Sequence, residues 1–113
     1  MKKEEIFKSY DEYVLSTYVR TPAVFVKGKG MILVDITGKK YLDFFPGWGV
    51  NNVGHCHPKV VAAVRDQIDK LIHIPNNFYH PHQARLAKEI VYWSFPGKVF
   101  FCNSGAEAIE AAI

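Results

Sequence analysis

The residues with the clearest capacity for chemistry form the turn Asn103-Ser104-Gly105-Ala106, which follows the apolar run 98–102 and precedes a helix-forming stretch. The first N–H groups of a helix have no partner within the helix, and the helix dipole places partial positive charge there. A phosphate fits such a site. Gly105 lacks a Cβ, so the backbone can approach an anion closely, and Ser104 can cap the helix and donate its hydroxyl. The pattern is therefore compatible with a phosphate site, although these residues alone favour a plain helix cap.

A plainer interpretation of the same turn stays open. Ser104 is a common type of N-cap, and Glu107 three residues later completes a capping-box pattern. The turn is not a Walker loop, because the chain has no GxxxxGK[ST] pattern. Glu107 and Glu110 share a helix face, but complementation of the helix dipole and packing suit them better than acid–base catalysis.

Histidine and cysteine raise the question of a metal site. The chain contains His55, His57, His73, His80 and His82, together with Cys56 and Cys102. Pro58 predicts a helix start beside His57, Gly54-His55 is typical of a turn, and no Cys-x-x-Cys spacing occurs. We therefore expect no metal ligands, and a small metal-binding module remains only an alternative. Cys102 is predicted to be a small buried hydrophobe.

The elements that must position these residues follow from the apolar periodicity. Helices are expected at 3–16, from 58 to about 73 and at 82–94, and strands at 23–26, 31–36, 40–44 and 98–102. The glycine-containing stretch 27–30 predicts a hairpin turn, so the first three strands form an antiparallel meander. Residues 45–54, rich in Gly and Asn, are expected to be irregular.

Composition bounds the class of protein. With 113 residues, 49% hydrophobic and 22% charged, the chain is typical of one small globular domain and not of a disordered segment. The net charge is +3 and the basic residues are scattered, which argues against nucleic acid as a partner. No apolar run approaches the roughly 20 residues of a membrane span, and no secretory signal is recognisable. We expect a cytoplasmic protein with free thiols and no membrane partner.

A series of motifs in a fixed order resembles the N-terminal part of the class III aminotransferases, over about residues 15–113. The motifs are Tyr18-x-Arg20-x-Pro22, Gly28-x-Gly30, Asp35-x-x-Gly38-x-x-Tyr41-Leu42-Asp43-Phe44, Gly54-His55-x-His57-Pro58 and Asn103-Ser104-Gly105-Ala106-Glu107-Ala108. These enzymes depend on pyridoxal phosphate and have fold type I. One motif alone is weak, whereas the ordered series is specific for the family.

The resemblance implies a cofactor, pyridoxal 5′-phosphate, and residues that would contact it. Backbone N–H groups of Ser104, Gly105 and Ala106 would bind its phosphate. Tyr18 falls where some relatives have a substrate-contacting tyrosine, and packing against the hairpin is the open alternative. Trp48 falls where relatives line the substrate pocket, and a role as a core or interface aromatic stays equally open.

The resemblance also implies the architecture: an α/β fold, as the N-terminal fragment of a fold type I transferase. Residues 1–75 would form a small-domain segment with a helix, the meander and a helix, and residues 76–113 the start of the large cofactor-binding domain. Asn76 would lie in a loop that reaches the active site. No catalytic residue is expected in this chain, because the family's Schiff-base lysine lies further along. The chain by itself is therefore expected to be inactive.

The activity that the resemblance implies is transfer of an amino group between N-acetylornithine, or a similar ω-amine, and 2-oxoglutarate, as part of arginine biosynthesis in a homodimer. Aminotransferases of ornithine, 4-aminobutyrate or other ω-amino acids, and a glutamate semialdehyde aminomutase, are alternatives within the fold. A short, non-catalytic protein that binds a partner is the alternative from another class.

Overall fold

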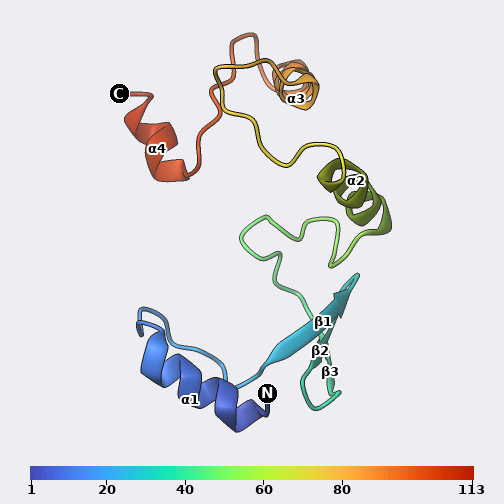
Figure 1. Ribbon diagram of the computed structural model, residues 1–113, viewed down its shortest axis with the longest axis vertical. Helices are drawn as coiled ribbons and strands as arrows, with labels where there is room; N and C mark the ends of the chain where they lie inside the picture. Colours follow the sequence, from blue (N-terminus) through green and yellow to red (C-terminus); the bar gives the residue numbers. More distant parts are fainter. The chain divides into compact units, whose positions relative to one another are not determined.

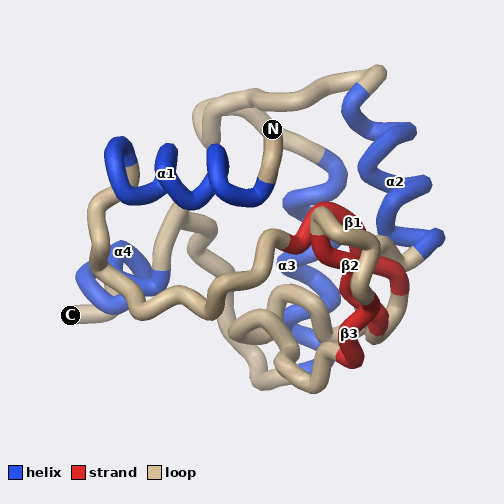
Figure 2. Tube along the Cα trace, turned by 90° about the horizontal axis from the view of Figure 1, so that it is seen from below, coloured by secondary structure: helices blue, strands red, loops and turns tan.

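The computed structural model describes all residues, 1–113, and the chain forms two compact units, Met1–Lys70 and Leu71–Ile113. The first unit contains α1 (Lys3–Tyr13), β1 (Phe25–Lys29), β2 (Ile32–Asp35), β3 (Lys40–Leu42) and α2 (Pro58–Ile68), and the second contains α3 (Pro81–Trp93) and α4 (Gly105–Glu110) (Figure 1). Long loops join most of these elements (tan in Figure 2).

The strands form one antiparallel sheet in the order β1-β2-β3, drawn in red in Figure 2. This confirms the predicted three-stranded meander. The turn predicted at 27–30 is wrong, because β1 continues through Gly28 and Lys29, which pair with Leu33 and Ile32. The chain therefore reverses direction at Gly30 and Met31, between the end of β1 and the start of β2.

Asp35 organises the turn between β2 and β3, and it is the one buried residue of the chain, with 7% of its surface exposed. Its Oδ1 accepts hydrogen bonds from the hydroxyl of Thr37 (2.6 Å) and from the N–H groups of Thr37 (2.9 Å) and Lys39 (3.0 Å). Its Oδ2 accepts the hydroxyl of Tyr41 at 2.9 Å. These donors, the Thr37 hydroxyl first, lower the pKa of Asp35 to about 2, although burial opposes the shift.

The helices α1 and α2 begin where the sequence predicts, α3 begins one residue before its predicted start at 82, and all three end earlier than predicted. Pro58 and Pro81 each occupy the first turn of their helix, α2 and α3. α2 stops at Ile68 and not near residue 73, because the N–H of Lys70 donates to the carbonyl of Gln67 in a tighter turn. α1 stops at Tyr13, where the next residue turns extended.

The strand predicted at 98–102 is absent, and that prediction is wrong for this chain. A strand is stabilised by ladder hydrogen bonds, and no other segment pairs with these residues. Cys102, predicted to be buried, is exposed for the same reason, and its Sγ lies 3.4 Å from the carbonyl oxygen of Ser104.

The chain does not close a hydrophobic core. No apolar residue is buried, and the solvent-accessible surface is 10520 Å². The apolar faces of its elements are therefore open to further protein. None of the helices is both long and apolar enough to cross a membrane. The predicted division at residues 75 and 76 concerns a complete enzyme and stays a prediction.

Candidate functional site

The start of α4 has the local geometry of a capped helix. Ser104 is the N-cap, with the extended backbone angles φ −151° and ψ 160°. Its Oγ accepts a hydrogen bond from the N–H of Glu107 at 3.2 Å. The carboxylate of Glu107 accepts the N–H of Asn103 at 2.6 Å, one residue earlier than in a standard capping box. The plainer interpretation of the sequence, a Ser cap, is therefore correct.

The cap leaves two backbone donors of this turn open. The N–H groups of Gly105 and Ala106 donate to no group of the chain. A Cβ placed on Gly105 would meet nothing within 4 Å, so no other group of the chain crowds the side-chain position of this residue. Capping and anion binding are thus compatible at this turn, because the cap uses the N–H of Glu107 and leaves its two predecessors free.

The two predicted substrate residues lie in the first unit and are exposed. The side chain of Tyr18 is 76% exposed and that of Trp48 is 90% exposed. The indole of Trp48 packs edge-on against the ring of Phe45, with the ring centroids 5.3 Å apart. The predicted phosphate residues, Ser104, Gly105 and Ala106, are neighbours in the second unit, whereas Tyr18 and Trp48 belong to the first unit.

A partly buried hydrogen-bonded pair, Asp43 and His55, is the feature that sequence reasoning missed. Asp43 Oδ2 lies 2.6 Å from His55 Nε2, and the two side chains are only 16% and 18% exposed. The hydrogen bond from His55 lowers the pKa of Asp43, and so does the hydrogen bond that Asp43 accepts from the N–H of Phe45. Both residues stand in motifs of the sequence, but their separation of 12 positions gives no signal of contact.

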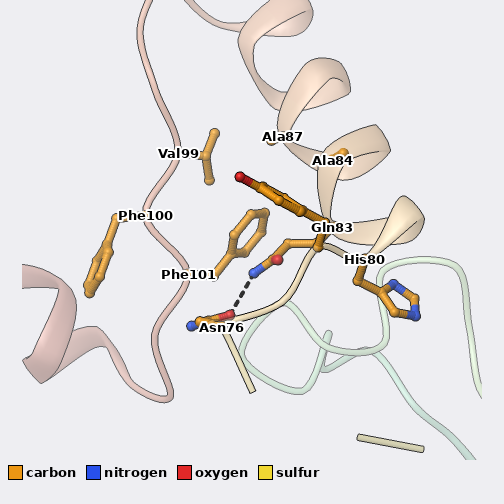
Figure 3. A pocket seen from close by; sticks show the side chains of 9 residues that line it. Asn76, His80, Gln83, Ala84, Ala87, Val99, Phe100 and Phe101 are labelled. Carbon is orange, nitrogen blue, oxygen red and sulfur yellow. Dashed lines mark hydrogen bonds between the residues drawn. The ribbon is translucent and has the colours of Figure 1, made fainter. Parts of the chain in front are cut away.

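A cavity of about 440 Å³ lies in the second unit, between α3 and the extended segment that precedes α4 (Figure 3). Gln83 Nε2 donates to Asn76 Oδ1 at 2.9 Å across one wall. Phe101 points to the same side as Gln83, while Phe100 points to the other side of its segment (Figure 3). Asn76, predicted to lie in a loop near an active site, thus lines a cavity, but nothing else in the structure assigns it a ligand.

The histidines do not assemble into a metal centre. No group of three or more His, Cys, Asp or Glu side chains is placed to hold an ion. His55 is engaged by Asp43, and His80 Nδ1 accepts the N–H of His82 at the start of α3.

Comparison with known proteins assigns the chain to a family. The family described as Aminotransferase class-III matches residues 13–113. The chain is 54% identical over 113 residues to an acetylornithine aminotransferase of Methanocaldococcus jannaschii, covering 100% of this chain and 28% of that protein. The chain therefore spans little more than a quarter of that relative's length.

Solved structures agree over almost the whole chain. The acetylornithine aminotransferase of Elizabethkingia anophelis superposes with a TM-score of 0.90 at 33% identity, covering 99% of this chain and 29% of that one. A taurine:2-oxoglutarate aminotransferase of Bifidobacterium kashiwanohense, solved in complex with PLP and glutamate, gives 0.86 at 29% identity, covering 99% and 26%.

Proposed function

The chain belongs to the class III aminotransferases, as its ordered motifs predict, and from this premise we propose that it is the N-terminal part of a longer enzyme. That enzyme would transfer an amino group between N-acetylornithine, or a similar ω-amine, and 2-oxoglutarate. The proposal is supported by the relatives' names and by the 28% of the relative's length that the chain spans. The open apolar faces of the chain also support it, since further protein would cover them.

The observation that carries the proposal is the pair of unused N–H groups at Gly105 and Ala106. Two donors, a positive helix end and space beside a glycine fit the phosphate of pyridoxal 5′-phosphate. When bound, this cofactor supplies an electron sink for chemistry at the amino-bearing carbon.

The work of this chain would be to bind and orient. Ser104 caps α4 and so fixes the helix start, from which the two free N–H groups would donate to the phosphate. The carboxylate of Glu107, held by the N–H of Asn103, complements the dipole without occupying those donors. A phosphate fixed at this turn would anchor the cofactor, and rigid anchoring of a reactant is a large part of catalysis.

Tyr18 and Trp48 would face the substrate in the complete enzyme. Both residues are largely exposed here, and of the two Trp48 makes an aromatic contact, edge-on with Phe45. An indole is a large amphipathic surface, and it would limit the size of the amino donor that enters. The choice of N-acetylornithine over other ω-amines as the amino donor rests on the relatives' names.

The remaining parts of the proposal concern the assembly. We expect a homodimer in the cytoplasm, with small-molecule partners and no nucleic acid. The open apolar faces would be shared between the rest of the enzyme's own chain and the second copy.

The test is an assay of amino donors on the protein expressed from the complete reading frame. N-acetylornithine, ornithine, 4-aminobutyrate and taurine are each supplied with 2-oxoglutarate and pyridoxal phosphate, and glutamate is quantified. The proposal expects glutamate with N-acetylornithine at the highest kcat/KM. A higher kcat/KM with a different donor would replace N-acetylornithine as the proposed substrate. Absence of glutamate with all four donors would refute the proposed activity.

A further inference from the structure

The loop that carries Trp48 adopts an unusual backbone. Gly47, Trp48 and Gly49 are three consecutive residues with positive φ, at 59°, 56° and 88°. Glycine adopts such angles freely, but for a bulky residue like tryptophan they are an outlier. Strained residues of this kind persist only where the surroundings hold them, and they cluster at functional sites. Something must therefore fix this loop while its indole stays 90% exposed.

Turn hydrogen bonds hold the tip of the loop only locally. The N–H groups of Gly49 and Asn51 both donate to the carbonyl of Pro46, at 3.2 and 3.0 Å. The N–H of Val50 donates to the carbonyl of Gly47 at 3.1 Å. These bonds shape the turn, but none of them ties it to the sheet.

The base of the loop is tied to the sheet by the N–H of Asp43, which donates to the carbonyl of Met31 at 2.8 Å, and by the Asp43–His55 pair. The N–H and carbonyl groups of His55 pair with those of Gly30 at 2.8 and 2.9 Å, beside the turn between β1 and β2. The side chain of His55 lies so close to β1 that a Cβ on Gly28 would come within 2.8 Å of it. His55 is therefore fixed by backbone and by packing before it meets Asp43.

Asp43 connects His55 to the segment that carries Trp48. An ionised carboxylate only accepts hydrogen bonds, so the Nε2–H group of His55 is the donor to Asp43 Oδ2 in this 2.6 Å contact. The other oxygen, Oδ1, accepts the N–H of Phe45 at 3.0 Å. The ring of Phe45 then packs edge-on against the indole of Trp48. A continuous chain of contacts thus runs from the sheet to the exposed indole.

We propose that Asp43 and His55 are positioning residues that orient Trp48 toward the amino donor, acting through Phe45. The proposal rests on the proposed function for its substrate, but its structural part, the orientation of Trp48, stands on these contacts alone. Residues at the base of a loop affect substrate binding by holding the loop in place, and they do not touch the reacting atoms.

The test uses the protein expressed from the complete reading frame. Asp43→Ala removes the hydrogen bond with His55 and the one accepted from the N–H of Phe45, whereas His55→Gln keeps a side-chain N–H that can donate to Asp43. Asp66→Ala is the matched control, because it removes another carboxylate contact of 2.6 Å in the same unit, with Lys70, that is exposed and lies outside the loop. The readouts are kcat and KM for the amino donor and the near-ultraviolet circular dichroism of Trp48, obtained by subtracting the spectrum of each protein's Trp48→Phe counterpart.

Asp43→Ala is expected to raise KM for the donor about tenfold with kcat changed by less than about threefold, since it loosens binding and not the chemistry. His55→Gln and Asp66→Ala should stay within about threefold of the wild type in both constants. Asp43→Ala combined with Trp48→Ala should be no worse than Trp48→Ala alone, because the two residues act in series. The dichroism of Trp48 should be lost only in Asp43→Ala.

Two results would overturn the proposal: additive effects of Asp43→Ala and Trp48→Ala on KM, or an unchanged Trp48 signal in Asp43→Ala. Failure of the proposed function has a different signature, namely no glutamate from the wild type. In that case the Trp48 signal still decides, and its loss in Asp43→Ala but not in Asp66→Ala would support the positioning role.

Discussion

Replacing Gly105 with proline removes one N–H donor from the proposed phosphate site while leaving the helix able to form. Gly105 is the first residue of α4, and proline is favoured at that position. The residue before a proline must be extended, and Ser104 already is, at φ −151° and ψ 160°. The chain accepts proline at the start of α2 and α3, at Pro58 and Pro81. A side chain at residue 105 also meets nothing within 4 Å.

The expected loss follows from one charge-assisted hydrogen bond. Hydrogen bonds to charged groups contribute about 1.5–3 kcal/mol, and every 1.4 kcal/mol is tenfold in affinity. Gly105→Pro should therefore weaken binding of pyridoxal phosphate by roughly 10- to 100-fold. The assay is a titration of the cofactor's visible absorbance on the protein from the complete reading frame, with thermal unfolding of the apoprotein as the check on folding.

Gly105→Ala is the matched control, because it adds a Cβ to the same empty space and keeps the N–H. Its dissociation constant should lie between those of the wild type and Gly105→Pro. Wild-type affinity in a folded Gly105→Pro protein would refute the role of this donor. Equal weakening by both variants would show that close approach to the glycine matters and the N–H does not.

Three further outcomes follow from contacts of the chain. Ser104→Asp should leave the melting temperature unchanged, since Asp caps a helix as well as Ser. It should weaken binding of the cofactor by more than about 100-fold in the same titration, because its carboxylate repels the phosphate. Gly28→Ala should destabilise the protein by about 1–3 kcal/mol in urea unfolding, because its Cβ would overlap the side chain of His55. Tyr41→Phe should destabilise by about 1 kcal/mol at neutral pH through the lost bond to Asp35. The folded pKa of Asp35, about 2, lies below its ordinary 3.8, so its stabilisation exists above pH 3.8 and fades as pH falls toward 2, and the deficit of Tyr41→Phe should shrink over that range.

The elements that the sequence predicted well are those whose signals are local. Pro58 marks the start of α2 because proline suits the first helical turn, and the meander follows from β-branched runs broken by glycines. The Ser104 cap is likewise a matter of four adjacent residues. Family resemblance added the proposal that the anion is the cofactor phosphate, which the turn alone does not distinguish from other anions.

The features that sequence reasoning missed depend on partners elsewhere in space. The segment 98–102 has the composition of a strand but no neighbour to pair with in this chain. The Asp43–His55 contact joins residues 12 positions apart through an irregular loop, where no periodicity places side chains. The left-handed backbone of Trp48 is also beyond a propensity argument, because tryptophan rarely adopts it.

The central claim is that this chain is the phosphate-binding N-terminal part of a longer aminotransferase. The most direct measurement is the DNA sequence that follows the codon of Ile113. The account predicts an open frame that brings the total to about 400 residues, since 113 residues are 28% of a relative, and that supplies the lysine to which the cofactor attaches. A stop codon immediately after Ile113 would contradict it, and would favour a short protein that binds a partner without catalysis.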